Sequence, residues 1–165
     1  DEIPAGKEGF VYANPESHIR LGLELATRYG FHPGYALYEP GFVRLGAALE
    51  RAYPKVPQCI YRFMFSDGLS FGFPPQPYGL DAFLKLLAQE APHAPWMIAG
   101  LDVNIAPLIT YAVERGGHVR VGLEDAPFGA RKTNVQLVED AVRLIRSVGK
   151  EPASTKEIRR ALGHA

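Results

Sequence analysis

Short apolar segments typical of buried strands alternate with capped helical patterns along the chain, and this alternation constrains the fold more than any other feature. We expect strands at residues 35–38, 59–65, 96–99 and 119–123. We expect helices at residues 14–29, 42–53, 80–89, 103–115 and 133–149, and a short final helix from residue 154. Strand–helix units repeating about every 20 to 35 residues predict parallel strands joined by right-handed crossovers.

Local signals indicate where several helices begin and end. Asn14 as N-cap and Pro15 in the first turn are expected to open the first helix, and Gly30 to close it. Capping boxes are predicted at two further starts, Thr133 with Gln136 and Ser154 with Glu157. In the helix at 42–53, the spacing predicts a buried face made of Phe42, Leu45, Leu49 and Ala52.

Two α/β architectures fit such units, an open doubly wound sheet and a (β/α)8 barrel. A dinucleotide-binding sheet should carry G-x-G-x-x-G directly after its first strand, and the glycines at 68–72 and 116–117 lie in other contexts. The barrel is therefore favoured, and four units are half of the eight that it requires. The chain opens with Asp1 and a loop at 3–6, so we expect a single partial TIM-barrel domain over residues 1–165, as a piece of something longer.

The composition points to a small-molecule partner. Acidic and basic residues number 18 each and no Lys/Arg cluster occurs, which removes the electrostatic argument for nucleic acid or an anionic membrane. The single cysteine, Cys59, lies in an apolar run and is expected to be a buried structural thiol. No apolar run approaches the roughly 18 residues that span a bilayer, so a cytoplasmic location is expected.

Chemistry is expected where the strand at 119–123 ends in two adjacent carboxylates, Glu124 and Asp125. Strand alternation would place Arg120 and Glu124 on one face and Asp125 on the other. Arg120 would then keep Glu124 ionised as a hard-oxygen metal ligand, and Asp125 would be free to act as a base. Alternatively, Arg120 and Glu124 form a structural ion pair, and Asp125 only starts a turn before Pro127.

The run G-G-H-V-R-V-G-L-E-D at residues 116–125 resembles the signature of the β-keto acid cleavage enzyme family. Further segments share the resemblance, at residues 38–42, 63–68, 95–100, 134–138 and 153–159. The resemblance covers nearly the whole chain. It implies a zinc-dependent (β/α)8 barrel of which this chain is the C-terminal half, with about four parallel strands, the last four β/α units and a short C-terminal helix.

The resemblance also implies a reaction and roles for three residues. Family members condense a β-keto acid with acetyl-CoA and release acetoacetate and a new acyl-CoA. Glu124 would be a ligand of the Zn²⁺ ion, beside an H-x-H pair on an early strand, while Arg120 and Asp125 match the activating arginine and the catalytic acid/base. Acetyl-CoA would be the co-substrate, and the full-length form would be a homo-oligomer. Strand ends at Glu39, 66–68 and 100–102 face the same mouth, and no role is assigned to them.

The chain departs from the family in one respect, because it contains no H-x-H. Its histidines are isolated from one another: His18, His32, His93, His118 and His164. His118 shares the Arg120 face but lies at the other end of the strand. A lone carboxylate makes a weak zinc site, so this chain alone is expected to be inactive. Two alternatives remain. One is a non-catalytic or partner-completed half-barrel, and the other is a different metal-dependent aldolase or lyase, which would keep Glu124 but need not keep Arg120.

Overall fold

The computed structural model describes residues 13–69 and 71–163. The expected loop at 3–6 and His164 lie outside the described residues. Within the described part, helices and strands alternate in the order α1 Glu16–Tyr29, β1 Gly34–Leu37, α2 Gly41–Ala52, β2 Ile60–Phe65, α3 Pro77–Glu90, β3 Trp96–Gly100, α4 Ala106–Glu114, β4 His118–Val119, α5 Asn134–Ser147 and α6 Thr155–Ala161.

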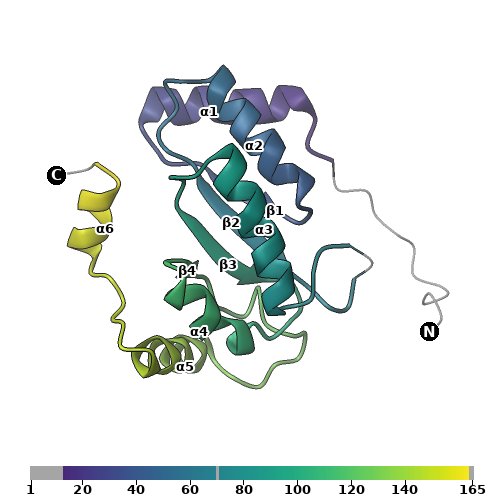
Figure 1. Ribbon diagram of the computed structural model, residues 1–165, viewed down its shortest axis with the longest axis vertical. Helices are drawn as coiled ribbons and strands as arrows, with labels where there is room; N and C mark the ends of the chain where they lie inside the picture. Colours follow the sequence, from purple (N-terminus) through teal and green to yellow (C-terminus); the bar gives the residue numbers. More distant parts are fainter. Residues whose placement is uncertain (1–12, 70, 164–165) are drawn as a thin grey trace.

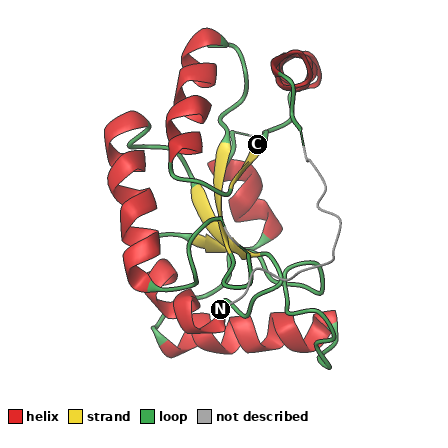
Figure 2. Cartoon of the chain, turned by 90° about the vertical axis from the view of Figure 1, so that its right-hand side faces the viewer, coloured by secondary structure: helices red, strands yellow, loops and turns green. Residues whose placement is uncertain are grey.

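The strands form one parallel four-stranded sheet in the spatial order β1-β2-β3-β4, which is also their order in the chain. Right-handed crossovers between consecutive parallel neighbours place the connecting helices on one face of a sheet. Figure 2 shows long helices along one side of the strands, and in Figure 1 α1 lies near one end of the sheet and α5 near the other. The predicted α/β half-barrel arrangement is confirmed.

The helix-covered face of the sheet holds the hydrophobic core. Tyr61, Phe63 and Phe65 alternate along β2 and are fully buried. The Phe63 ring stacks on Phe83 of α3 at a centroid distance of 4.6 Å, and on Trp96 of β3 at 5.7 Å. This aromatic contact fixes α3 against the two central strands.

The opposite face of the sheet, called the inner face below, includes one row of residues that are not fully buried. Register places Ala36, Arg62, Met97 and His118 in one row across the four strands. Arg62 and Met97 are half-buried and His118 is exposed. Polar groups that project from this face therefore lie on the side of the sheet away from the packed helices.

The predicted buried face of α2 was wrong. Phe42 and Leu45 are 43% and 47% exposed, and the helix instead buries Val43, Gly46 and Ala47. A Cβ atom at Gly46 would lie only 2.9 Å from the Tyr35 ring and 3.2 Å from the Tyr61 ring. Because small residues let a helix approach a sheet closely, the small-residue side of α2 faces the strands, and the larger apolar side chains remain outside.

The capping predictions had mixed outcomes. Asn14 is not the N-cap of α1, because the helix begins one residue later with Pro15 at that position and no side-chain cap. Gly30 closes α1 in the left-handed conformation, as predicted. Both predicted capping boxes are present, at the starts of α5 and α6.

The fourth strand is shorter than predicted, since β4 contains only His118 and Val119. Arg120 still donates its backbone N–H to the Ile98 carbonyl, at 2.9 Å, before the chain leaves the sheet. The Gly122 carbonyl then accepts the backbone N–H groups of Asp125 and Ala126 and closes a turn. The strand alternation expected up to residue 125 is lost within this turn.

The turn after β4 packs against the end of β3. The Asp125 carbonyl accepts the Val103 backbone N–H at 3.1 Å, and a Cβ atom at Gly100 would lie 2.9 Å from that same carbonyl oxygen. Gly100 therefore permits a backbone contact that a larger residue would block.

None of the described helices is long and apolar enough to cross a membrane.

We expect the Cys59 thiol to be nearly unreactive in the folded protein. Its side chain is fully buried, and burial raises the pKa of the thiol from 9.0 to about 11. That shift lowers the thiolate fraction at pH 8 by about 100-fold. Titration with a disulfide reagent should give negligible labelling in buffer and one equivalent in guanidinium chloride. As a control, Ser17→Cys on the exposed side of α1 should add one fast equivalent, and rapid labelling of Cys59 itself would contradict its burial.

Gly100→Ala should destabilise the protein by about 1 to 3 kcal/mol, because its methyl group would push against the Asp125 and Val103 carbonyls. The free energy of unfolding is measured by urea denaturation. Gly34→Ala is the matched control, since its Cβ atom meets nothing within 4 Å, and its effect should stay within about 0.5 kcal/mol. Equal effects of the two substitutions would show that Gly100 is not a packing constraint.

Candidate active site

The turn after β4 brings Arg120 and Asp125 together at the carboxyl edge of the sheet. Arg120 Nε donates to both carboxylate oxygens of Asp125, at 3.1 Å each, and its Nη2 forms a further ion pair with Oδ1. The Asp125 side chain is only 5% exposed, against 29% for Arg120. This forked contact orients the buried carboxylate and balances its charge.

The prediction that Arg120 holds Glu124 while Asp125 points to the other face was wrong. Glu124 is 83% exposed, and its Oε1 lies 3.8 Å from Arg120 Nη2, whereas Asp125 is the close partner. The reason is the turn at Gly122, which ends the strand alternation before either carboxylate is reached. The alternative of an Arg120–Glu124 ion pair is present as a loose contact at 3.8 Å with an exposed Glu124, beside the closer pair with Asp125. The two carboxylates nevertheless differ in environment, since one is buried and the other open to solvent.

Burial dominates the electrostatics of Asp125. Desolvation raises the pKa of the Asp125 carboxyl above its ordinary value, although the Arg120 guanidinium acts in the opposite direction. In turn, the hydrogen bonds from Arg120 to Asp125 raise the pKa of the guanidinium. A buried carboxyl of raised pKa next to a fixed cation is suited to accept and return a proton.

Residues that the sequence analysis did not single out hold the turn in place. Asn134, the first residue of α5, accepts the Leu123 backbone N–H on Oδ1 at 2.9 Å. Asp102 has a left-handed backbone with φ of 54° and accepts the Phe128 backbone N–H on its own Oδ1. Asp102 lay within the strand end at 100–102 to which no role was assigned, and its positive φ could not be anticipated from the sequence. Asn134 follows Thr133 of the predicted capping box, and that motif does not indicate a hydrogen bond to the Leu123 backbone.

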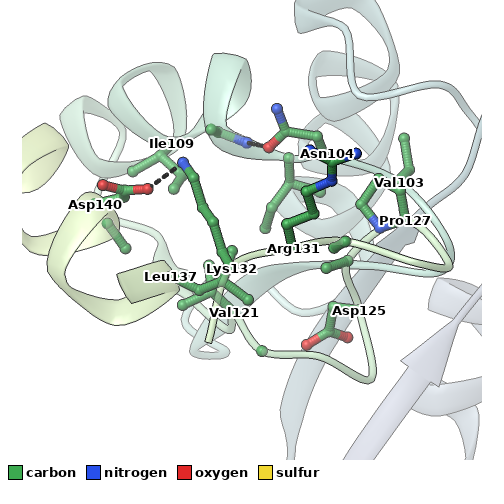
Figure 3. Close-up of a pocket in the computed structure, with 16 residues that line it drawn as sticks. Val103, Asn104, Ile109, Val121, Asp125, Pro127, Arg131, Lys132, Leu137 and Asp140 are labelled. Atoms are coloured by element: carbon green, nitrogen blue, oxygen red, sulfur yellow. Dashed lines mark hydrogen bonds and ion pairs between the residues drawn. The ribbon is translucent and has the colours of Figure 1, made fainter. Parts of the chain in front are cut away.

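A cavity of about 370 Å³ lies next to the turn, between α4, α5 and the loop that follows β4 (Figure 3). Its walls are largely apolar, with Ile109, Val121 and Leu137 among them. An ion pair between Lys132 and Asp140 closes one side. Asp125 lies at another edge of the cavity, apart from that pair. The carboxyl edge of the sheet is therefore hollowed beside the buried acid.

The described residues do not make a complete metal site. Within 13–69 and 71–163, no group of three or more His, Cys, Asp or Glu side chains could hold a metal ion. Glu124 offers one exposed carboxylate, and His118 lies on the row of Arg62 and Met97, nearer the start of the strands. Zinc sites need three or four protein ligands, so these residues alone do not fit a zinc ion.

Breaking the Arg120–Asp125 pair should cost more than removing both partners. We expect Arg120→Ala to destabilise the protein by about 3 kcal/mol, because it leaves a buried carboxylate unpaired. The double variant with Asp125→Ala should lose at least about 1 kcal/mol less than the sum of the single variants. Urea denaturation of the four proteins measures this coupling.

The exposed pair Arg146–Glu151, with side chains 60% and 69% exposed, is the matched control for this cycle. Its coupling should stay below about 1 kcal/mol. Additive losses at Arg120 and Asp125 would mean that the contact does not hold the buried acid.

Comparison with known proteins identifies the family. The family model described as beta-keto acid cleavage enzyme matches residues 3–163. A 3-keto-5-aminohexanoate cleavage enzyme of Acetoanaerobium sticklandii is 25% identical over 158 residues, which cover 93% of this chain and 56% of the relative.

Two further relatives carry names that mention acetyl-CoA. A 3-dehydrocarnitine:acetyl-CoA trimethylamine transferase of Rhizobium meliloti is 29% identical over 93% of this chain and 50% of its own length. A 3-oxoadipate:acetyl-CoA acetyltransferase of Cupriavidus necator is 25% identical over 93% of this chain and 55% of its own. The chain thus spans about half the length of the curated relatives it matches. With a family match along nearly all of its residues, and the buried Arg120–Asp125 pair within the matched region, the chain belongs to the β-keto acid cleavage enzyme family.

Proposed function

We propose that this chain supplies the C-terminal half of an active site that exchanges acyl groups between a β-keto acid and acetyl-CoA, with acetoacetate and a new acyl-CoA as products. The buried Asp125 carboxylate, held by Arg120 at the carboxyl edge of the sheet, is the observation that carries the proposal. Family membership and the names of the relatives support the reaction class.

In the proposed reaction, Asp125 moves one proton. The carbon between the keto and carboxylate groups of a β-keto acid is acidic, and Asp125 accepts its proton. The electron pair left on that carbon forms a bond to the acetyl carbonyl of acetyl-CoA, and the CoA thiolate leaves. The thiolate then attacks the original keto carbon, the old carbon–carbon bond breaks, and the released acetoacetate regains its proton from Asp125. Arg120 keeps Asp125 ionised and oriented between these steps.

Glu124 is proposed to give one ligand to a Zn²⁺ ion. Its exposed carboxylate is free to turn toward a metal, since its contact with Arg120 is loose at 3.8 Å. The site needs further ligands from outside the described residues. A partner-completed half-barrel is the second candidate function, because the described donor set is incomplete.

The test is acetoacetate formation from acetyl-CoA and a panel of β-keto acids. The protein is expressed from its complete reading frame, and the 165-residue chain is assayed in parallel. We expect activity in the first case, and none in the second unless a partner is added, because the described residues offer one candidate zinc ligand. Asp125→Asn should lower kcat by about 10² to 10⁴-fold, as expected for loss of an acid/base group. Glu124→Gln should lower the zinc content.

Asp81→Asn is the matched control for this substitution. The Asp81 carboxylate also accepts a side-chain hydrogen bond, from the Tyr111 hydroxyl at 2.9 and 3.0 Å to its two oxygens, but Asp81 lies on α3 away from the turn. The kcat of the Asp81→Asn protein should remain within about threefold of the wild type. An Asp125→Asn protein with full activity would reject the proposed base. Turnover of the keto acid without acetyl-CoA would instead favour another metal-dependent lyase.

A further inference from the structure

Arg62 is a cation without a counter-ion at the centre of the sheet. Its Nε atom is buried and has no hydrogen-bond partner. No ion pair to Arg62 occurs among residues 13–69 and 71–163. Charged side chains are rarely buried without a partner, and an unsatisfied buried donor costs free energy. The position of Arg62 therefore calls for an anionic partner.

The inner face of the sheet brings Arg62 toward the candidate site. Arg62 lies in the central strand β2, between Tyr61 and Phe63, whose rings point to the helix-covered face and belong to the core. Its side chain consequently projects from the inner face. The Arg62 charge is near enough to interact with the Asp125 carboxylate. Arg62 therefore lies on the inner face, in the neighbourhood of the Arg120–Asp125 pair.

The carboxylates around this point are placed beside Arg120 rather than Arg62. Arg62 and Arg120 contribute two positive charges, and Asp125 is the only buried carboxylate of the described part of the chain. Asp125 is already engaged by Arg120 through both of its oxygens. Glu124 is 83% exposed and lies beside Arg120. Both carboxylates are therefore next to Arg120, and Arg62 has no direct ion-pair partner among residues 13–69 and 71–163.

Ser66 provides a second unpartnered group at the end of the same strand. Its residue is 5% exposed, and Oγ is buried with no hydrogen-bond partner, while its backbone N–H donates to the Phe73 carbonyl. Ser66 has the same parity in the strand as Arg62, so the alternation assigns both to the inner face. The Ser66 hydroxyl and the Nε–H of Arg62 are thus two buried donors of this face without a partner among the described residues, and both could donate to an oxygen anion.

We propose that Arg62, assisted by the Ser66 hydroxyl, binds a carboxylate of the substrate beside Asp125. This inference rests on the proposed function for the identity of the substrate, and it adds the group that holds one end of it. A planar guanidinium donates two parallel hydrogen bonds to a carboxylate, which fixes the direction of the bound acid as well as its charge. The carboxylate is either the one next to the keto group or a second one at the far end of the substrate.

Binding without turnover tests this assignment. The protein from the complete reading frame is titrated calorimetrically, in the absence of acetyl-CoA, with acetoacetate, 3-oxoglutarate, methyl acetoacetate and inorganic phosphate. Arg62→Met should weaken binding of at least one of the two acids by about tenfold or more, and Arg62→Lys should restore part of the affinity. Methyl acetoacetate, which has no carboxylate, should bind weakly to all variants.

The matched control is Arg44→Met, which removes an exposed arginine of α2 and should leave every affinity unchanged.

If Arg62→Met loses affinity for both acids, Arg62 is assigned to the carboxylate next to the keto group. If it loses affinity for 3-oxoglutarate alone, Arg62 is assigned to a second carboxylate. The proposal is overturned if Arg62→Met binds both acids with affinities within twofold of the wild type. It is also overturned if phosphate binding depends on Arg62 while acid binding does not. Thermal melting confirms that each variant is folded. Because the titration needs no turnover, its result does not depend on whether the proposed acyl exchange occurs.

Discussion

The parallel pairing of β2 with β1 on one side and β3 on the other is the interaction on which the rest of the structure depends. Because consecutive strands are neighbours and run in the same direction, the helices between them cover one face, and all strand ends meet at one edge. The aromatic residues of β2 fill the covered face. The other face carries Arg62, whose buried Nε has no hydrogen-bond partner in the described part of the chain.

At the carboxyl edge, a short β4 and a tight turn decide the chemistry. Had the strand continued to Glu124, Arg120 and Asp125 would have pointed apart. Instead the chain turns at Gly122, and Asp125 is buried against Arg120. Backbone contacts with Val103 and the Gly100 region, and the Asn134 side chain, stabilise this arrangement. A buried ion pair costs desolvation, and in the proposed function this pair orients the residue that moves the proton.

The half-length of the chain relative to its relatives fits the unsatisfied groups that the structure contains. The described residues contain the paired Asp125 and Arg120. They offer Glu124 as a single candidate metal ligand, and Arg62 as a cation with no ion pair. Each of the incomplete elements lies at the carboxyl edge or on the inner face, and none lies in the helix-covered core. Under the proposed function, a substrate and further protein groups would make the remaining contacts.

The sequence by itself determined the α/β alternation, the parallel half-barrel, the capping boxes of α5 and α6 and the burial of Cys59. These follow from local periodicity and capping chemistry, which act over a few residues. Only the tertiary structure decided which side of α2 faces the sheet, where β4 ends, which carboxylate Arg120 binds, and that Arg62 is left without a partner. The physical reason is that each of these depends on close packing and desolvation between segments distant in the chain, such as Gly46 against Tyr35.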